Sequence, residues 1–179
     1  GQPLNLIYSY KYNGVDPATG LYTFEDIDKD GSITYPNDIK VNGSLDPKFY
    51  GGLTNSVKYK QWQFDLLFEF KKQLGQNYLS TFRTMTPGKM FNQPSSVLDR
   101  WPANTSNPVI GKFTTQSFGP AYSAVENLLL SDGIYSDASF VRLKNISLSY
   151  SLPLAILSRI KIQSCRIYLT GQNIMTLTN

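Results

Sequence analysis

The sequence predicts an all-β protein of antiparallel strands, and two regions of alternating polarity predict it most directly. From Trp62 to Lys71 the even positions are apolar and the odd positions are polar, with Leu67 as the exception. The same period of two, which is that of a β-strand, returns from Phe140 to Leu152. Aromatic residues make up 13% of the chain, and aromatic enrichment with alternating polarity fits all-β chains. Charged residues make up only 17%, less than the about 25% that is usual in a soluble domain.

A strand of this kind has one apolar face and one polar face, and periodicity alone allows two environments for it. The polar face can meet water outside a soluble sheet or inside a water-filled barrel. The apolar face of the segment that begins at Trp62 carries large aromatic rings, which suit lipid as well as a protein core. Its length matches the roughly 9–11 residues of a tilted strand that crosses a bilayer.

The first half of the chain contains several predicted strands. Residues 3–12 alternate in polarity and are expected to form a strand, the turn formers of residues 14–20 follow it, and residues 21–24 form a short extended piece. Residues 49–72 predict two long strands joined by a tight turn at Lys60-Gln61.

The second half begins with a long segment of weak periodicity. Residues 73–137 are rich in Ser, Thr, Asn, Pro and Gly and predict functional loops or an irregular insertion, with a short helix at residues 124–130. Pro153 is expected to stop the strand that begins at Phe140, and a final strand is expected over residues 162–171.

Composition argues against two classes of function. The 17 Lys and Arg residues are scattered, the net charge is +4, and we find no motif that reads bases, so no nucleic-acid partner is predicted. Histidine is absent, which removes the commonest general base. Asp65 and Glu69 share one strand face, but two carboxylates suit a glycosidase only when they flank a cleft. We therefore predict a protein that is not an enzyme.

Residues 26–33 match the first eight positions of an EF-hand-like calcium loop. Asp26, Asp28 and Asp30 alternate along the loop, Gly31 allows the sharp turn, and Ser32 offers a backbone carbonyl. The twelfth position, where a bidentate carboxylate normally closes the shell, holds Asn37, and Asp38 follows it. The predicted Ca²⁺ ligands are Asp26, Asp28, Asp30, Ser32 and Asp38. The alternative is an acidic, solvated turn without a metal.

Four aromatic residues of the long segment are candidates for contact with a substrate or a lid protein: Trp101, Phe118, Tyr122 and Tyr135. Exposed rings in loops can stack on sugars. The alternative is that they pin the long segment to itself.

Several motifs together resemble one protein family. They are GVDPATGLY, DIDKDGSIT, DPKFYGGLTNSVKYK, Arg100-Trp101, ASFVRLKNISLSYSLP and IYLTGQNIMTLT. In this order and spacing they resemble the C-terminal barrel portion of SusC/RagA-type TonB-linked outer-membrane transporters. The resemblance covers residue 3 to the end of the chain, and its most specific parts are residues 46–60 and 139–153.

The resemblance implies that residues 1–179 are part of a large transmembrane β-barrel of about 22 antiparallel strands with long extracellular loops. The N-terminal plug domain and the final strands are expected to be absent from this chain. The parent protein would import glycans or peptides across the outer membrane with a SusD-like lipoprotein, and TonB would act through the missing N-terminal region. Outer-membrane lipid would contact the even positions from Trp62 to Phe70. Residues 73–137 would be extracellular and Lys60-Gln61 periplasmic.

Two other functions remain as alternatives to the transporter. One is a soluble β-sandwich module that carries calcium in its Asp-rich loop and binds glycans. The other is a fragment of a glycoside hydrolase that uses carboxylates alone.

Overall fold

The computed structural model describes residues 3–102 and 108–178, and the chain divides into two compact units. Unit 1 comprises residues 1–46 and 74–136, and unit 2 comprises residues 47–73 and 137–179. All strand pairs in both units are antiparallel, which confirms the predicted antiparallel all-β class. The helices are few and short. Among the described residues no helix combines the length and the hydropathy needed to span a bilayer.

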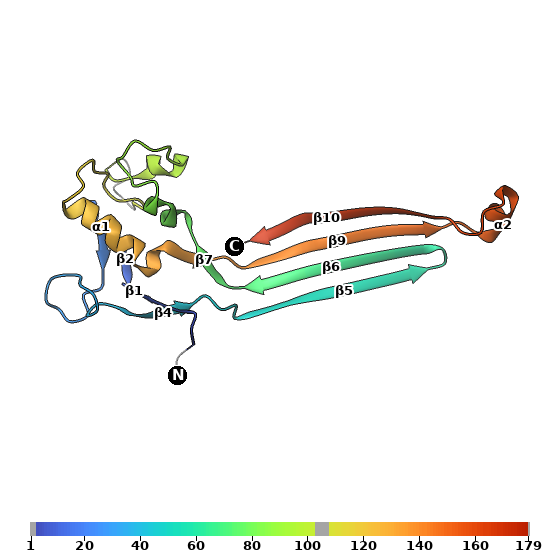
Figure 1. Ribbon diagram of the computed structural model, residues 1–179, viewed down its shortest axis with the longest axis horizontal. Helices are drawn as coiled ribbons and strands as arrows, with labels where there is room; N and C mark the ends of the chain where they lie inside the picture. The colour runs from blue at the N-terminus through green and yellow to red at the C-terminus, as the bar shows by residue number, and fades with distance from the viewer. Residues whose placement is uncertain (1–2, 103–107, 179) are drawn as a thin grey trace. The chain divides into compact units, whose positions relative to one another are not determined.

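Unit 2 is a four-stranded sheet in the order β10-β9-β6-β5 (Figure 1). Its strands are β5 (Phe49–Tyr59), β6 (Trp62–Lys72), β9 (Phe140–Ser151) and β10 (Arg166–Thr178). The predicted tight turn is confirmed, because only Lys60 and Gln61 separate β5 from β6. β9 ends just before Pro153, as predicted. The short helices α2 (Leu154–Leu157) and η4 (Ser158–Ile160) then lead to β10.

The register of this sheet places apolar residues opposite apolar residues on one face. On that face, Phe64 of β6 lies between Val57 of β5 and Leu148 of β9, and Leu148 pairs in turn with Leu169 of β10. The opposite face carries polar rows, such as Ser56, Asp65 and Ser147. Because side chains alternate across a strand, the sheet has one apolar face and one mainly polar face, on which Leu67 and Phe140 also lie.

A β-bulge in β9 keeps the two faces separate. Leu67 of β6 pairs with Asn145 and Phe68 pairs with Leu143, so Lys144 is the extra residue. The Lys144 Nζ lies 3.1 Å from the Oε2 of Glu69, which places this cation with the polar row. The bulge therefore lets Leu143 join the apolar face without moving a charge onto it.

Unit 1 is built from three two-stranded sheets and several short helices. The strand pairs are β1 (Leu6–Ser9) with β4 (Lys40–Ser44), β2 (Tyr12–Val15) with β3 (Tyr22–Phe24), and β7 (Leu74–Gln76) with β8 (Tyr135–Asp137). The helices are η1 (Tyr78–Arg83), η2 (Ser95–Asp99), α1 (Pro120–Leu129) and η3 (Asp132–Ile134).

The hydrophobic core of unit 1 lies mainly in the segment that the sequence predicted to be irregular. Phe82, Ile110 and Leu128 have no exposed surface, and they pack in one cluster with Tyr22 of β3. Residues 73–137 are therefore not simply loops, because they supply most of a packed core. The short helix predicted at residues 124–130 is confirmed as α1, which begins earlier, at Pro120.

Two predicted strands have different bounds in the structure. The strand expected over residues 3–12 is interrupted, because Tyr10 leaves β1 and pairs its backbone with the segment after α1. Its N–H donates to the Leu130 carbonyl over 3.2 Å, and its carbonyl accepts from the Asp132 N–H over 3.0 Å. The last strand begins later, at Arg166, and continues beyond Gly171 because β9 offers partners up to Phe140.

Two phenylalanines of unit 1 give a matched test of this core. Phe82→Ala removes a ring with 0% exposure and should lower the free energy of unfolding by about 3–5 kcal/mol. Phe118→Ala removes a ring with 94% exposure and should change it by less than about 0.5 kcal/mol. Urea titration followed by Trp101 fluorescence in a Trp62→Phe background measures both. Equal effects of the two substitutions would contradict the described core.

Candidate metal centre

The Asp-rich loop lies in unit 1 between β3 and β4. Residues 25–39 leave the hairpin of β2 and β3 and return to β4, and the turn passes through Gly31 at a φ of +84°. A backbone in this left-handed region favours glycine, which agrees with the role predicted for Gly31. Ile33 is half-buried, while the loop tip at Asp28 to Ser32 is exposed.

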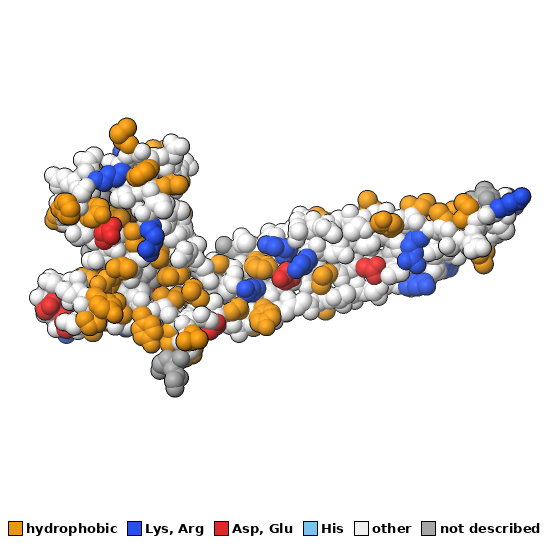
Figure 2. All heavy atoms as spheres, viewed as in Figure 1, with side chains coloured by type: hydrophobic (Ala, Val, Ile, Leu, Met, Phe, Trp, Pro, Cys, Tyr) orange, Lys and Arg blue, Asp and Glu red, His pale blue; other side chains and the backbone are white. Residues whose placement is uncertain are grey.

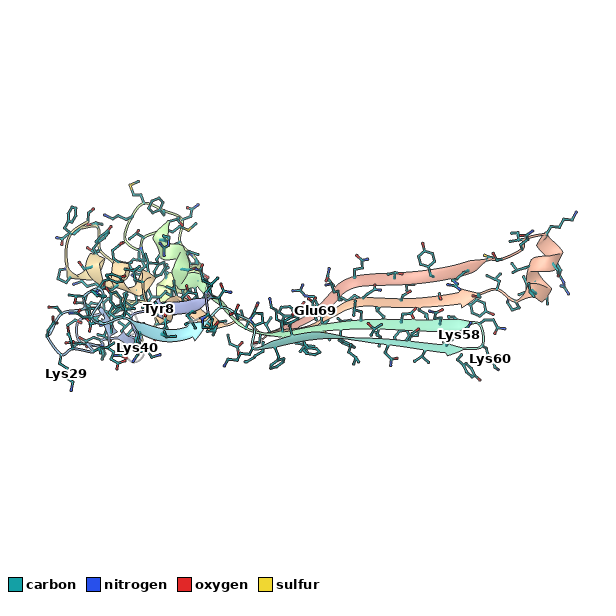
Figure 3. The ribbon with its side chains drawn as sticks, turned by 60° about the horizontal axis from the view of Figure 1, so that its bottom comes forward. Tyr8, Lys29, Lys40, Lys58, Lys60 and Glu69 are labelled. Carbon is teal, nitrogen blue, oxygen red and sulfur yellow. The ribbon has the colours of Figure 1, made fainter. Side chains whose placement is uncertain are left out.

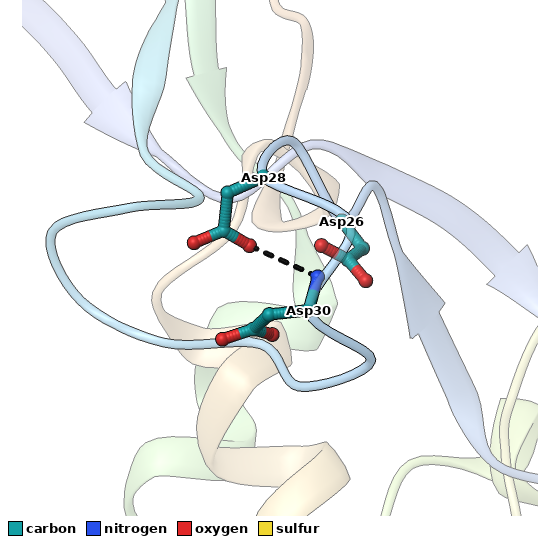
Figure 4. A group of neighbouring side chains, drawn as sticks. All are labelled: Asp26, Asp28 and Asp30. Carbon is teal, nitrogen blue, oxygen red and sulfur yellow. Dashed lines mark hydrogen bonds between the residues drawn. The ribbon is translucent and has the colours of Figure 1, made fainter.

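The three predicted carboxylates are brought together in this loop (Figure 4). One oxygen from each of Asp26, Asp28 and Asp30 lies within 4.8 Å of the others. Calcium binds oxygens at about 2.3–2.6 Å, so two ligands on opposite sides of one ion are about 5 Å apart. The spacing of the three carboxylates therefore fits a single calcium ion. Their chemistry, hard anionic oxygen, fits it too.

Backbone N–H groups of the loop also point at these carboxylates. Asp26 accepts from the N–H groups of Lys29 and Gly31 over 2.6 and 2.9 Å. Asp28 accepts from the Asp30 N–H over 3.3 Å, and Asp30 accepts from the Ser32 N–H over 2.8 Å. These backbone donors offset part of the repulsion among the three carboxylates. The hydrogen bonds therefore help to hold the loop in its conformation without a cation.

Asn37 and Asp38, at the twelfth and thirteenth positions, differ in their contacts. The Asn37 Nδ2 donates to the Oδ2 of Asp28 over 2.8 Å. Asp38 has 0% exposure, and its Oδ1 and Oδ2 accept from the N–H groups of Ile27 and Thr34 over 2.7 and 2.8 Å. Asp38 thus joins the two ends of the loop. The sequence predicted Asp38 as a metal ligand and did not reveal these hydrogen bonds.

Hydrogen bonds to its ionised form hold the pKa of Asp38 below its usual range. The Thr34 N–H has the largest effect and the Ile27 N–H follows, while burial opposes them. The charged form of Asp38 is therefore the form that stabilises the loop.

A hollow of about 760 Å³ in unit 1 borders the loop. Asp26, Gly31 and Ser32 line one side of it, and Pro120 and Asn127 of α1 line another. An ion at the loop would have access to solvent through this hollow.

Of the four predicted contact aromatics, Trp101 lies in a second hollow of about 760 Å³ in unit 1, which Lys112 and Gln116 also line. Its Nε1 donates to the Pro17 carbonyl over 2.8 Å, and its ring lies so close to Gly20 that a Cβ there would come within 2.5 Å of it. Trp101 therefore anchors the turn between β2 and β3 in addition to lining the hollow.

The other three aromatics are not gathered around this hollow. Phe118 is almost fully exposed, Tyr122 is half-buried on α1, and Tyr135 packs against the core cluster of unit 1. The structure does not assemble the four rings into one surface.

The carboxylates of the sheet already have polar partners. Asp65 accepts hydrogen bonds from Ser56 and Gln63, and Glu69 forms the ion pair with Lys144. Neither Asp65 nor Glu69 lines any of four hollows found among the described residues.

Asp38→Asn tests the link across the loop. An amide side chain has one acceptor oxygen instead of two, so we expect the Ile27 or the Thr34 amide to lose protection from hydrogen exchange. In the unchanged protein the pKa of Asp38 is lowered from 3.8, so its stabilising effect is complete above about pH 4 and is lost as the pH falls through the lower folded value. Asp16→Asn, which removes a carboxylate bonded to Thr19, is the control. Unchanged protection of both amides in Asp38→Asn would contradict the link.

The chain is similar to two curated proteins of Formosa agariphila. It is 29% identical over 195 residues to TonB-dependent receptor P3, a match that covers 100% of this chain and 18% of the relative. It is 27% identical over 169 residues to TonB-dependent receptor P26, which covers 89% of this chain and 16% of that relative. The chain thus spans less than a fifth of the length of these relatives. No family model matches it.

Solved structures give the same result. The RagAB peptide importer in its closed-closed state has a TM-score of 0.71 and 24% identity, and the match covers 96% of this chain and 19% of that one. A structure of the RagAB peptide transporter has a TM-score of 0.71, 25% identity and the same coverage. The resemblance predicted from the motifs is confirmed: in sequence and in fold, this chain is similar to one segment of a SusC/RagA-like TonB-dependent transporter.

Proposed function

We propose that this chain is a membrane-spanning part of a TonB-dependent transporter of the outer membrane, and that it has no catalytic role. The observation that carries the proposal is the two-faced sheet of unit 2. Its four strands have 11, 11, 12 and 13 residues, enough to cross a bilayer at a tilt. The apolar face would meet lipid, and the polar face would meet water in the lumen of a barrel.

The exposed apolar face argues against the soluble β-sandwich. In a sandwich, a second sheet would cover this face. Among the described residues of unit 2 the sheet has a single layer, and side chains of this face such as Leu53, Val57 and Leu169 are more than half exposed. An uncovered apolar sheet of this size suits lipid and not water.

The names of the similar proteins support a proposal for the partners and the cargo of the transporter. The curated relatives are named TonB-dependent receptors, and the solved structures are named RagAB peptide importer and RagAB peptide transporter. We infer that the parent protein works with a SusD-like lipoprotein and with TonB, and that it imports peptides or glycans. Trp101, Phe118, Tyr122 and Tyr135 stay predicted contacts for cargo or for the lipoprotein.

We also propose that the Asp-rich loop binds Ca²⁺ through Asp26, Asp28, Asp30 and the Ser32 carbonyl. The convergence of three carboxylates within 4.8 Å supports this proposal. Asp38 is expected to act mainly through its hydrogen bonds to Ile27 and Thr34, since it is buried and is not one of the three carboxylates whose oxygens converge. The ion would stabilise the loop and would take no part in a reaction.

Neighbouring leucines on opposite faces of β6 test the membrane placement. Leu66→Arg puts a charge on the apolar face and should destabilise the protein in lipid by about 2–4 kcal/mol if the position lies at mid-depth. Leu67→Arg puts the same charge on the polar face and should cost less than about 1 kcal/mol. Urea titration of the parent transporter, folded in lipid vesicles, measures both effects. A larger cost for Leu67→Arg would reverse the assignment of the faces.

Isothermal titration with calcium chloride tests the metal site. Without a carboxylate at position 37, we expect weak binding with a Kd of about 10⁻⁴–10⁻³ M, and weaker competition by magnesium, which prefers a rigid octahedron. Asp28→Asn with Asp30→Asn should abolish the heat of binding. Asp99→Asn with Glu126→Gln removes the same charge elsewhere in unit 1 and should leave binding intact. If the two double variants behave alike, the loop is an acidic turn without a metal.

A further inference from the structure

One end of the unit 2 sheet, where Lys60 and Gln61 join β5 to β6, combines cationic, aromatic and exposed aliphatic side chains. We call it the turn end and define it as residues 59–62 and 150–166. It contains the turn between β5 and β6 and the connection from β9 through α2 to β10 (Figure 1).

The turn end carries cations and no acidic residue. Unit 2 has ten Lys and Arg residues against three Asp and Glu residues. Lys60, Arg159 and Lys161 all lie at the turn end, and Figure 3 shows Lys60 beside the turn. The sequence contains no Asp or Glu at residues 47–64 or 138–178. None of the ion pairs found in the described parts of the chain involves these three cations.

Aromatic rings stand next to these cations on the apolar face. Tyr59, Trp62 and Tyr150 lie side by side across β5, β6 and β9, and the rings of Trp62 and Tyr150 are 4.7 Å apart between centroids. The Lys60 Nζ lies 5.3 Å from the centre of the Tyr59 ring. Tyr and Trp favour the boundary between hydrocarbon and headgroups, so this row marks the depth of a membrane interface.

The connection between β9 and β10 is amphipathic. Leu157 is buried and anchors the segment, whereas Leu154, Ile156 and Ile162 expose apolar side chains beside Arg159 and Lys161. Figure 2 shows hydrophobic and cationic side chains together at this end of the sheet. Exposed aliphatic groups mixed with cations are typical of segments that lie on an anionic bilayer surface.

We propose that the turn end binds the phosphate headgroups of anionic phospholipids through Lys60, Arg159 and Lys161. The aromatic row would lie beside the upper acyl chains, and Leu154 and Ile156 would enter the interface. This inference rests on the proposed membrane placement of the sheet. The far end of the sheet differs, because its Lys72 is already paired with Asp137.

The fluorescence of Trp62 can report which lipid lies next to the turn end. This chain has two tryptophans, so replacing Trp101 and every tryptophan of the parent transporter outside this chain by Phe leaves Trp62 as the single fluorophore. The parent transporter is reconstituted into vesicles of phosphatidylcholine with 30% phosphatidylglycerol. Bromine, which quenches tryptophan, is placed on the acyl chains of one lipid or of the other.

We expect phosphatidylglycerol to quench Trp62 more strongly than phosphatidylcholine at equal mole fraction, with a preference of about two- to fivefold that falls as salt is added. Lys60→Asn with Lys161→Asn should reduce the preference toward onefold. Asn is the replacement of choice because both residues have a positive φ, 53° and 58°, which Asn tolerates.

The control is Lys48→Gln with Lys71→Gln, which removes two charges near the far end of β5 and β6 and should leave the preference unchanged. Equal quenching by the two lipids would overturn the headgroup site but not the proposed function. Absence of quenching by either lipid would overturn the membrane placement itself. Equal loss of preference in both double variants would overturn the assignment to the turn end.

Discussion

The structure of unit 2 depends on the separation of an apolar face and a polar face on the two sides of one sheet. The register between β6 and β9 places Phe64 beside Leu148 and Asp65 beside Ser147 at successive positions. A shift of one residue would exchange the two faces of a strand. The register therefore determines which side of the sheet can face lipid, and the proposed function follows from it.

The same sheet also has a requirement that it does not meet by itself. Among the described residues, β5 and β10 each have one neighbouring strand, so each leaves a row of backbone N–H and C=O groups on its outer side. In hydrocarbon each unsatisfied group would cost several kcal/mol, so a membrane sheet has to close or be flanked. If unit 2 lies in a bilayer, strands from elsewhere must pair with β5 and β10. This agrees with a chain that matches less than a fifth of its relatives.

Most of the sheet could be predicted from sequence, because alternating polarity is a local property. The bounds of β6 and the turn at Lys60-Gln61 followed from it directly. The sequence also contains a signal for the bulge in β9, which the strand prediction for this segment did not include. Apolar residues occupy odd positions at Val141 and Leu143 but even positions at Ile146 and Leu148, so one extra residue is needed to keep them on one face.

Unit 1 was harder to predict because its core joins distant segments with no common period. Phe82 and Leu128 lie 46 residues apart in the sequence, in two short helices, and each helix alone is too short to show a clear apolar stripe. In the Asp-rich loop, the spacing of the motif correctly predicted that the carboxylates of Asp26, Asp28 and Asp30 lie close together. It could not reveal that Asp38 holds the loop through two backbone amides, since that contact depends on how the chain returns to β4.

The overall charge hides an asymmetry that becomes visible only with the division into units. The net charge of +4 combines unit 2, with ten basic and three acidic residues, and unit 1, with seven basic and ten acidic residues. The acidic unit contains the predicted calcium ligands, and the basic unit contains the sheet. An excess of negative charge favours binding of a cation, and an excess of positive charge favours contact with anionic headgroups. Each proposed ligand is therefore matched to the charge of the unit that would bind it.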